Sequence, residues 1–335
     1  MWGGPSRRFH LANNEKIVYL GDWSPVTRKA LLEYLPEGFE LVFADVSTEE
    51  KRIAAVADAD YIVVAAEYMP TKAVEAAVRC KVIHKIGEGT DRIDTAKARE
   101  RGIIVARTAG TNSNSVAEAT TMLILATMRR LVEAHNMVVA GKWPKWELRP
   151  GNYELKGRQV GIVGLGKIGK TIARHVQAFG AKVVYYKRTP LSPEEEAAMD
   201  VRYLPLDDLL KTSDVVTLQV PNTPATKGMI GTRELALMKP TAILVNTCRG
   251  GIVDEDALVR AIREGRIRGA ATDVYAKEPP SPENPLLSLN NVVLTPHYTG
   301  GSEDCEIEGV KRFYANVVKI SRGEPLAPDD YAPAS

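Results

Sequence analysis

The chain has 335 residues, of which 44% are apolar and 26% charged, with a formal net charge of +2. This balance gives no reason to expect nucleic acid or an anionic membrane surface as a partner, and no apolar run is long enough to cross a bilayer. The N-terminus lacks the apolar stretch of a secretory signal. The three cysteines, Cys80, Cys248 and Cys305, form neither a disulfide framework nor a Cys-x-x-Cys pair. We therefore expect a soluble, cytoplasmic protein of two domains.

Short apolar runs alternate with helical stretches in the first third of the chain. This alternation predicts parallel βαβ units and a doubly wound sheet. Strands are expected at 17–20, 41–43, 61–64 and 103–105, with helices such as 48–59 and 71–79 between them.

One long helix is expected over 115–132, where apolar residues and alanines recur. An irregular stretch follows it, from Gly141 to Trp146, and carries two tryptophans. Tryptophan is enriched at protein interfaces, but a plain surface flap explains this stretch equally well.

The strand and helix rhythm then restarts and predicts a second α/β domain. Its strands are expected at 159–163, 182–186, 215–220, 242–245, 270–274 and 292–294. The tail from Gly323 onwards contains three prolines, and we expect it to be loose and non-catalytic.

Gly164, Gly166 and Gly169 form a G-x-G-x-x-G turn between a strand and a helix that ends near Gly180. The glycines allow the backbone to turn tightly and approach a pyrophosphate, and the helix start offers free N–H groups to it. A turn without a ligand is the alternative, but the flanking strand and helix favour dinucleotide binding.

The end of the next strand predicts which nicotinamide coenzyme is preferred. An acid at this position would bind the ribose hydroxyls of NAD, but the sequence has Lys187, Arg188 and Thr189. Two cations and a hydroxyl suit the additional phosphate of NADP. We expect NADP(H) to be favoured and NAD(H) to be possible; a solvated basic turn is the alternative.

Three polar segments follow strands in the last third and carry Arg249, Glu278 and His297. Because parallel strands end at one edge of a sheet, these side chains are expected at the ligand-binding edge. Arg249 could bind a carboxylate and a carbonyl oxygen, and His297 could protonate a developing alkoxide. Glu278 could hydrogen-bond His297 and keep its proton available near neutral pH. Each of the three residues, taken alone, also has a non-catalytic interpretation: the histidine as a capping residue, the arginine as a solvated loop charge and the glutamate as an exposed side chain.

These motifs, together with the segments 87–94 and 116–118, resemble the D-isomer-specific 2-hydroxy acid dehydrogenases, which include glyoxylate/hydroxypyruvate reductases and phosphoglycerate dehydrogenases. The resemblance covers about residues 15–322 and implies a hydride transfer between the coenzyme and a small 2-keto or 2-hydroxy acid, with glyoxylate or hydroxypyruvate favoured as substrate. Arg249, Glu278 and His297 would be its catalytic residues, and no metal is implied. Substrate binding is expected at Lys85, Gly87, Glu88, Gly89, Arg249 and His297. Coenzyme binding is expected at Val116, Thr120, Gly164, Gly166, Lys167, Ile168, Gly169, Lys187, Arg188, Thr189, Val220, Pro221, Thr226, Thr247, Cys248, Arg249, Asp273, His297 and Gly300.

The resemblance also implies how the domains are arranged. A Rossmann coenzyme domain, 108–298, would be inserted in a flavodoxin-like substrate domain made of 12–107 and 299–330. The helix from Ser115 and the tryptophan-containing stretch resemble the arm through which this family forms homodimers. For Asp273 the resemblance implies a hydrogen bond to the nicotinamide amide, whereas we expect Cys248 to have a packing role.

The sequence departs from the family pattern at Gln219, Ala109 and Glu88. Glu88 lies between the two glycines expected to bind the substrate carboxylate, where a small or apolar residue is usual. It could tune substrate choice, point away or pair with Lys85. A coenzyme-sensing, corepressor-like protein on the same fold is the alternative function; a formate-type dehydrogenase is disfavoured because Glu278 stands where that group is expected to have Gln.

Overall fold

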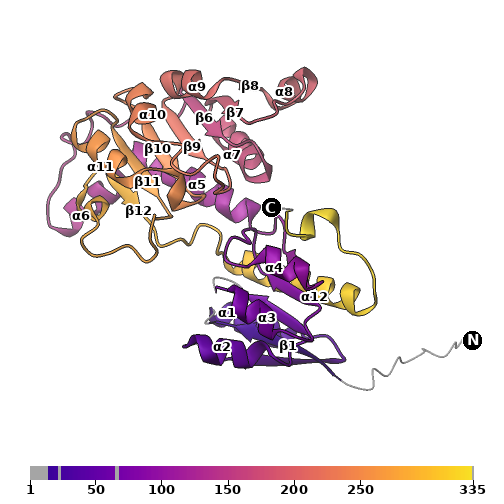
Figure 1. Ribbon diagram of the computed structural model, residues 1–335. Helices are drawn as coiled ribbons and strands as arrows, with labels where there is room; N and C mark the ends of the chain where they lie inside the picture. Colours follow the sequence, from indigo (N-terminus) through magenta and orange to yellow (C-terminus); the bar gives the residue numbers. More distant parts are fainter. Residues whose placement is uncertain (1–13, 22–23, 65–67, 334–335) are drawn as a thin grey trace, which may run out of the picture. The chain divides into compact units, whose positions relative to one another are not determined.

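The computed structural model describes residues 14–21, 24–64 and 68–333. The chain divides into two compact units, one made of Met1–Asn112 with Ser302–Ser335 and the other of Ser113–Gly301. In Figure 1 the first unit contains the indigo segments and the yellow C-terminal helix, and the second runs from magenta to orange. Among the described residues, no helix is both long and apolar enough to span a bilayer.

The first unit contains a five-stranded parallel sheet in the order β2-β1-β3-β4-β5. Buried aliphatic and aromatic side chains cover both faces of this sheet, as expected for a parallel sheet covered by helices. Its elements are β1 (Glu15–Leu20), α1 (Pro25–Glu33), β2 (Phe39–Ala44), α2 (Glu49–Val56), β3 (Tyr61–Val64), α3 (Thr71–Ala76), β4 (Val82–Lys85), α4 (Thr95–Glu100), β5 (Ile104–Arg107), α12 (Glu303–Ser321) and the 3-10 turn η3 (Pro328–Asp330).

The second unit contains a seven-stranded parallel sheet in the order β12-β11-β10-β9-β6-β7-β8. Its elements are α5 (Ser113–Met128), α6 (Leu131–Val139), β6 (Gln159–Val163), α7 (Lys167–Ala178), β7 (Lys182–Tyr186), α8 (Pro193–Met199), β8 (Val201–Tyr203), α9 (Leu206–Thr212), β9 (Val215–Leu218), α10 (Thr232–Leu237), β10 (Ile243–Asn246), η1 (Gly250–Ile252), α11 (Glu255–Arg263), β11 (Gly269–Thr272), η2 (Pro285–Ser288) and β12 (Val292–Leu294). The chain runs outward from β6 to β8 and then returns to β9 on the other side of β6. This reversal of strand order is the point at which doubly wound sheets bind ligands. The predicted α/β fold with two parallel sheets is confirmed.

The helix expected over 115–132 is wrong in its extent. Helix α5 ends at Met128, and Arg130 adopts a left-handed backbone conformation with φ of 51° before α6 begins. The Arg130 side chain donates to both carboxylate oxygens of Glu133 and to the Pro150 carbonyl. These contacts, one of them distant in sequence, accompany the break between the two helices.

The expectation of a loose C-terminal tail is also wrong for the part of the tail that the structure describes. Tyr331 forms an antiparallel bridge with Ala106 on β5, and the Ala332 N–H donates to the Val105 carbonyl over 2.9 Å. The Asp330 side chain is 1% exposed and paired with Arg312 of α12. The tail therefore pairs with β5, the edge strand of the first sheet, and covers that edge.

Candidate active site

The three predicted catalytic residues follow three neighbouring strands of the second sheet. Arg249 comes after β10, Glu278 after β11 and His297 after β12, and these strands are adjacent in the sheet. Because the strands are parallel, all three residues lie beyond their carboxyl ends. The structure thus brings all three residues to the carboxyl ends of neighbouring strands in the second unit.

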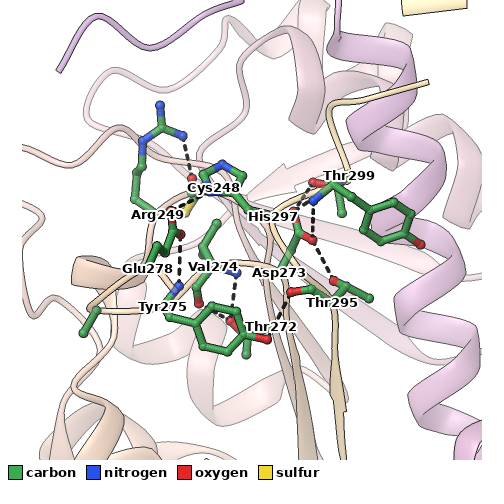
Figure 2. Close-up of polar contacts among 12 residues, drawn as sticks. Cys248, Arg249, Thr272, Asp273, Val274, Tyr275, Glu278, Thr295, His297 and Thr299 are labelled. Carbon is green, nitrogen blue, oxygen red and sulfur yellow. Dashed lines mark hydrogen bonds and ion pairs between the residues drawn. The ribbon is translucent and has the colours of Figure 1, made fainter. Parts of the chain in front are cut away.

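His297 and Glu278 are in direct contact, as Figure 2 shows. The histidine Nδ1 lies 2.8 Å from Glu278 Oε2, and the other Glu278 oxygen accepts from the Tyr275 N–H over 3.3 Å. Because a carboxylate only accepts hydrogen bonds, Nδ1 carries the proton in this pair. The Nε2 atom is then the ring nitrogen through which the imidazole can exchange a proton with another molecule. The His297 side chain is 44% exposed, so that molecule can reach it.

Asp273 braces the loop that carries His297. Its carboxylate is 0% exposed and accepts four hydrogen bonds, from the Thr295 hydroxyl, the Tyr298 N–H, and the N–H and hydroxyl of Thr299. The backbone carbonyl of Asp273 also accepts from the His297 N–H over 2.8 Å. Figure 2 shows these contacts converging on the carboxylate.

This bracing explains an unusual backbone conformation. His297 has φ of 53°, in the left-handed region that non-glycine residues rarely adopt. Such a conformation persists only when surrounding contacts determine it. Residues on both sides of the histidine donate hydrogen bonds to Asp273, and these contacts hold His297 in this conformation.

Arg249 is held by the turn that leaves β10. The Asn246 side chain accepts from the Cys248 N–H and donates to the Arg249 carbonyl, which closes the turn. The next residue, Gly250, passes so near the Tyr275 backbone that a Cβ atom would lie 2.0 Å from its carbonyl oxygen. The segment containing Arg249 therefore lies against the segment that leads to Glu278. The guanidinium itself donates to the Cys248 carbonyl over 2.8 Å (Figure 2).

Cys248 has the environment of a packing residue. Its Sγ donates to Asn246 Oδ1, and the side chain packs against the core of the second unit. Burial raises the pKa of the Cys248 thiol, which disfavours the reactive thiolate.

The glycine-rich turn between β6 and α7 has the geometry that a pyrophosphate needs. Gly164 has φ of 102°, and a Cβ there would lie 2.3 Å from the Gln219 carbonyl oxygen. A Cβ on Gly169 would lie 2.4 Å from the Gly164 oxygen, whereas a Cβ on Gly166 would point into space with nothing within 4 Å. Gly166 is also the N-cap of α7, and no side chain caps that helix. The open side and the uncapped first turn, with Lys167 and Ile168, fit a dinucleotide phosphate.

Two other predicted coenzyme residues are buried and paired with each other. The Thr120 and Thr247 hydroxyls lie 2.8 Å apart, and the Gln219 side chain donates to Thr247 over 2.9 Å. Both threonines are less than 10% exposed, at 0% and 7%. These contacts join α5 to the residues that follow β9 and β10, at the carboxyl end of the sheet.

The remaining predicted coenzyme residues also belong to the second unit. The Thr226 hydroxyl donates to the Pro221 carbonyl over 2.6 Å and closes the loop after β9. Val116 is buried on the first turns of α5, and Val220 is partly buried next to the glycine-rich turn. Gly300 follows the loop that Asp273 braces.

Lys187, Arg188 and Thr189 directly follow β7, whose last residue Tyr186 accepts a hydrogen bond from the Gly164 N–H. Within the part of the chain that the structure describes, neither of the two cations has an ion pair or a side-chain hydrogen bond. Their charge is therefore not neutralised by a neighbouring carboxylate.

The predicted substrate loop lies in the first unit, after β4. The Gly87 N–H donates to the Thr108 hydroxyl over 2.7 Å, whereas for Glu88 and Gly89 no described residue accepts from the backbone N–H. The Lys85 ammonium donates to the Ile86 carbonyl at the start of the loop. Two backbone donors of the loop are thus available to a ligand.

Glu88 pairs with a residue that the sequence did not suggest. Its carboxylate lies 3.2 Å from an Arg107 nitrogen and accepts from the Gly110 N–H over 2.8 Å. The pairing with Lys85, one of the expectations, is therefore wrong. The ion pair turns this carboxylate towards the segment 107–110.

Several residues that position the site were missed by sequence reasoning. Thr295 and Thr299 hold Asp273, Asn246 closes the arginine turn, and Arg107 holds Glu88. Only Asn246 had a local signal, because an asparagine at a strand end often bonds the backbone two residues on.

Comparison with known proteins agrees with this geometry. Residues 121–299 match the family model described as D-isomer specific 2-hydroxyacid dehydrogenase, NAD binding domain. The chain is 40% identical over 303 residues to a glyoxylate reductase of Thermococcus onnurineus, which covers 88% of this chain and 90% of that protein. It is 38% identical over 296 residues to a D-3-phosphoglycerate dehydrogenase of Methanocaldococcus jannaschii, covering 88% of this chain but 56% of the relative. The chain thus spans little more than half the length of such phosphoglycerate dehydrogenases.

A solved structure supports the same assignment. The apo form of D-mandelate dehydrogenase from Rhodotorula graminis superposes with a TM-score of 0.86 at 26% identity, covering 96% of this chain and 98% of that one. The matches extend over both units and include all three strand ends that carry Arg249, Glu278 and His297. The chain belongs to the D-isomer specific 2-hydroxyacid dehydrogenase family.

Proposed function

We propose that this protein is a nicotinamide-dependent oxidoreductase that reduces a small 2-keto acid to a D-2-hydroxy acid, and catalyses the reverse reaction. The observation that carries the proposal is the pair formed by His297 and Glu278 at the carboxyl ends of β11 and β12, beside the Arg249 turn. The relatives named above as glyoxylate reductase and D-mandelate dehydrogenase support it.

The chemistry follows from what each side chain can do. When bound, the reduced coenzyme supplies a hydride, which carries the electron pair to the keto carbon. Arg249 binds the substrate carboxylate and the carbonyl oxygen, so its charge stabilises the negative charge that develops on that oxygen. His297 donates its Nε2 proton to the oxygen, which completes the hydroxyl group. Glu278 holds the Nδ1 proton and orients the ring, so that Nε2 is the nitrogen that transfers the proton.

The units have separate roles in this proposal. The unit of Ser113–Gly301 holds the coenzyme, through the turn at Gly164, Gly166 and Gly169 and the loops after β7, β9 and β10. The unit of Met1–Asn112 and Ser302–Ser335 binds the substrate carboxylate through the backbone donors of Glu88 and Gly89 and the charge of Lys85. The relative named glyoxylate reductase supports glyoxylate as a substrate. We propose hydroxypyruvate, which is also a small 2-keto acid, as the other favoured substrate.

We further propose that NADP(H) is preferred over NAD(H). Lys187 and Arg188 follow β7 without a carboxylate partner among the described residues, and Thr189 adds a hydroxyl. One well-placed hydrogen bond from such a cation to the 2′-phosphate contributes about 1.5–3 kcal/mol, which is roughly ten-fold or more in affinity. The double substitution of Lys187→Asp with Arg188→Ala should shift the preference towards NAD(H).

The coenzyme proposal is tested by kcat/KM with both coenzymes at low salt, where phosphate contacts count most. The substitution Arg202→Ala on the neighbouring strand β8 serves as a control for the loss of a cation. Equal or better efficiency of the unmodified protein with NADH would overturn the proposed preference.

We propose a homodimer formed through α6 and the segment after it. Exposed large apolar side chains gather there: Leu131, Val132, Val138, Val139, Trp143 and Trp146. A cavity of about 330 Å³ lies beside the same helix, lined by Val132, Arg130 and residues at the amino ends of β10–β12. An apolar patch of this kind is usually covered by a partner, and a second copy offers the same segment by two-fold symmetry. Sedimentation of the unmodified protein as a monomer would contradict the dimer; Val139→Glu should produce that monomer.

A coenzyme-sensing, corepressor-like protein is the alternative function. The relatives reported above are named as reductases and dehydrogenases, which favours the enzyme. Coenzyme binding without oxidation of NADPH by any 2-keto acid would favour the sensor instead.

A further inference from the structure

Arg107 connects three segments of the first unit that are far apart in the sequence. It is the last residue of β5, and its side chain is 18% exposed. One guanidinium nitrogen lies 3.2 Å from the Glu88 carboxylate and 3.3 Å from the Glu88 carbonyl oxygen. Its Nε donates to the Asp329 carbonyl in the C-terminal segment over 3.0 Å.

The loop that Arg107 contacts needs external support. It contains Gly87, whose φ is 119°, and Gly89, so its own side chains do little to fix its backbone. Two contacts hold it to the segment after β5: the Gly87 N–H donates to Thr108, and the Glu88 carboxylate accepts from Gly110. Arg107 directly precedes this segment in the sequence, and its guanidinium neutralises the Glu88 carboxylate.

The C-terminal segment is itself firmly docked. Asp330 is 1% exposed and pairs with Arg312 at 2.7 Å, and the Leu326 N–H donates to the Tyr331 hydroxyl. Backbone contacts join Tyr331 and Ala332 to β5. A docked carbonyl at Asp329 therefore gives the Arg107 guanidinium a fixed acceptor.

We propose that Arg107 is a positioning residue for substrate binding, which links the loop 87–90 to the C-terminal segment 326–332. This inference rests on the proposed function, in which the Glu88 and Gly89 N–H groups bind the keto-acid carboxylate. Backbone donors bind an anion well only when they are held in place beforehand. The ion pair also neutralises Glu88, which would otherwise repel the anionic substrate. The C-terminal segment thus contributes to substrate affinity from outside the catalytic unit.

The test compares Arg107→Lys, Glu88→Gln and Asp330→Asn with the full-length unmodified protein. Lysine keeps the charge but cannot contact Glu88 and Asp329 together as the planar fork does. Asp330→Asn keeps the shape of the C-terminal segment but removes its ion pair with Arg312. The matched control is Arg79→Lys, because Arg79 pairs with Asp60 in the same unit, where β3 and β4 begin and away from the loop 87–90.

For Arg107→Lys we expect the KM for the keto acid to rise roughly ten-fold, the loss of one hydrogen bond to a charged group. The kcat value and the affinity for NADPH should stay near those of the unmodified protein. Amide hydrogen exchange in a peptide covering residues 87–90 should become faster in Arg107→Lys and in Asp330→Asn. In Glu88→Gln the exchange of this peptide should become faster by a smaller amount, because the amide oxygen can still accept a hydrogen bond from the Gly110 N–H.

Unchanged exchange in the 87–90 peptide of both variants would overturn the inference, as would an equal rise in KM for the Arg79→Lys control. Faster exchange for Arg107→Lys with no change for Asp330→Asn would overturn the part played by the C-terminal segment. The exchange measurement does not depend on activity. A protein that reduces no keto acid would refute the proposed function, while the exchange would still show whether Arg107 holds the loop.

Discussion

At the scale of single residues, the site depends on one exposed histidine and on the contacts that fix it. Substitution His297→Ala removes the proposed proton donor and leaves the glycine-rich turn of the coenzyme unit untouched. We expect kcat to fall by about 10²–10⁴-fold, the usual effect of losing a general acid, with the Kd for NADPH nearly unchanged. Near-normal turnover of His297→Ala would exclude this residue from the mechanism.

Asp273 offers a second test at the same scale. The family resemblance assigns it to the nicotinamide amide, but both of its oxygens already accept hydrogen bonds from the loop of His297. In Asp273→Asn one oxygen becomes an NH2 group that faces donors, so the loop should lose its left-handed conformation at His297. We expect a loss of about 1–3 kcal/mol in the free energy of unfolding and a lower kcat, measured by urea unfolding and steady-state kinetics. A selective loss of NADPH affinity at normal stability would support the amide role instead.

At the scale of the elements, substitutions in the turn between β6 and α7 distinguish an effect on folding from an effect on coenzyme binding. A methyl group on Gly166 meets nothing within 4 Å, whereas one on Gly169 meets the Gly164 carbonyl at 2.4 Å. Gly166→Ala should therefore keep the melting temperature of the unmodified protein but weaken NADPH binding, because the methyl group occupies space left for the pyrophosphate. Gly169→Ala should lower both. Isothermal titration and thermal unfolding check this, and full NADPH affinity in Gly166→Ala would place the phosphates elsewhere.

Some of these elements and site residues could be predicted from the sequence, and others could not. The strand, glycine turn and helix at 159–180 are fixed by local patterns, and so are the polar residues after β10, β11 and β12. The break at Arg130 was missed because it involves contacts with Glu133 and Pro150, which no periodic pattern reveals. The docked tail was missed because the partners of Asp330 and Ala332 lie on α12 and β5. The pairing of Glu88 with Arg107 likewise required the two strands β4 and β5 to be neighbours.

At the scale of the whole molecule, His84 makes stability depend on pH. It is fully buried on β4, and its Nε2 lies 3.1 Å from the Asn316 amide of α12. Burial lowers the pKa of His84 to about 3, although Asp330 acts to raise it; Lys85 and Arg312 lower it further. The unfolded chain binds a proton near the ordinary pKa of about 6.5, and the folded chain does not. Stability is therefore complete above that value and is lost as the pH falls towards the folded pKa.

The expected slope is about 1.4 kcal/mol per pH unit below pH ~6.5. It is measured as the free energy of unfolding of the unit that contains β4, by urea unfolding at several pH values. The substitution His84→Leu removes the titrating group, so its stability should fall less steeply over the same range. Equal slopes for the two proteins would show that His84 is not the group responsible.

The whole protein is proposed to reduce small 2-keto acids with a nicotinamide coenzyme, through the residues at the carboxyl ends of the strands of the second sheet. The most direct measurement is the oxidation of NADPH and NADH by the purified protein with glyoxylate, hydroxypyruvate and larger 2-keto acids, together with the configuration of the product. We predict turnover of at least one of these acids to the D-2-hydroxy acid, with kcat/KM roughly ten-fold or more higher for NADPH than for NADH. Tight coenzyme binding with no oxidation of either coenzyme by any acid in the panel would contradict the proposed activity.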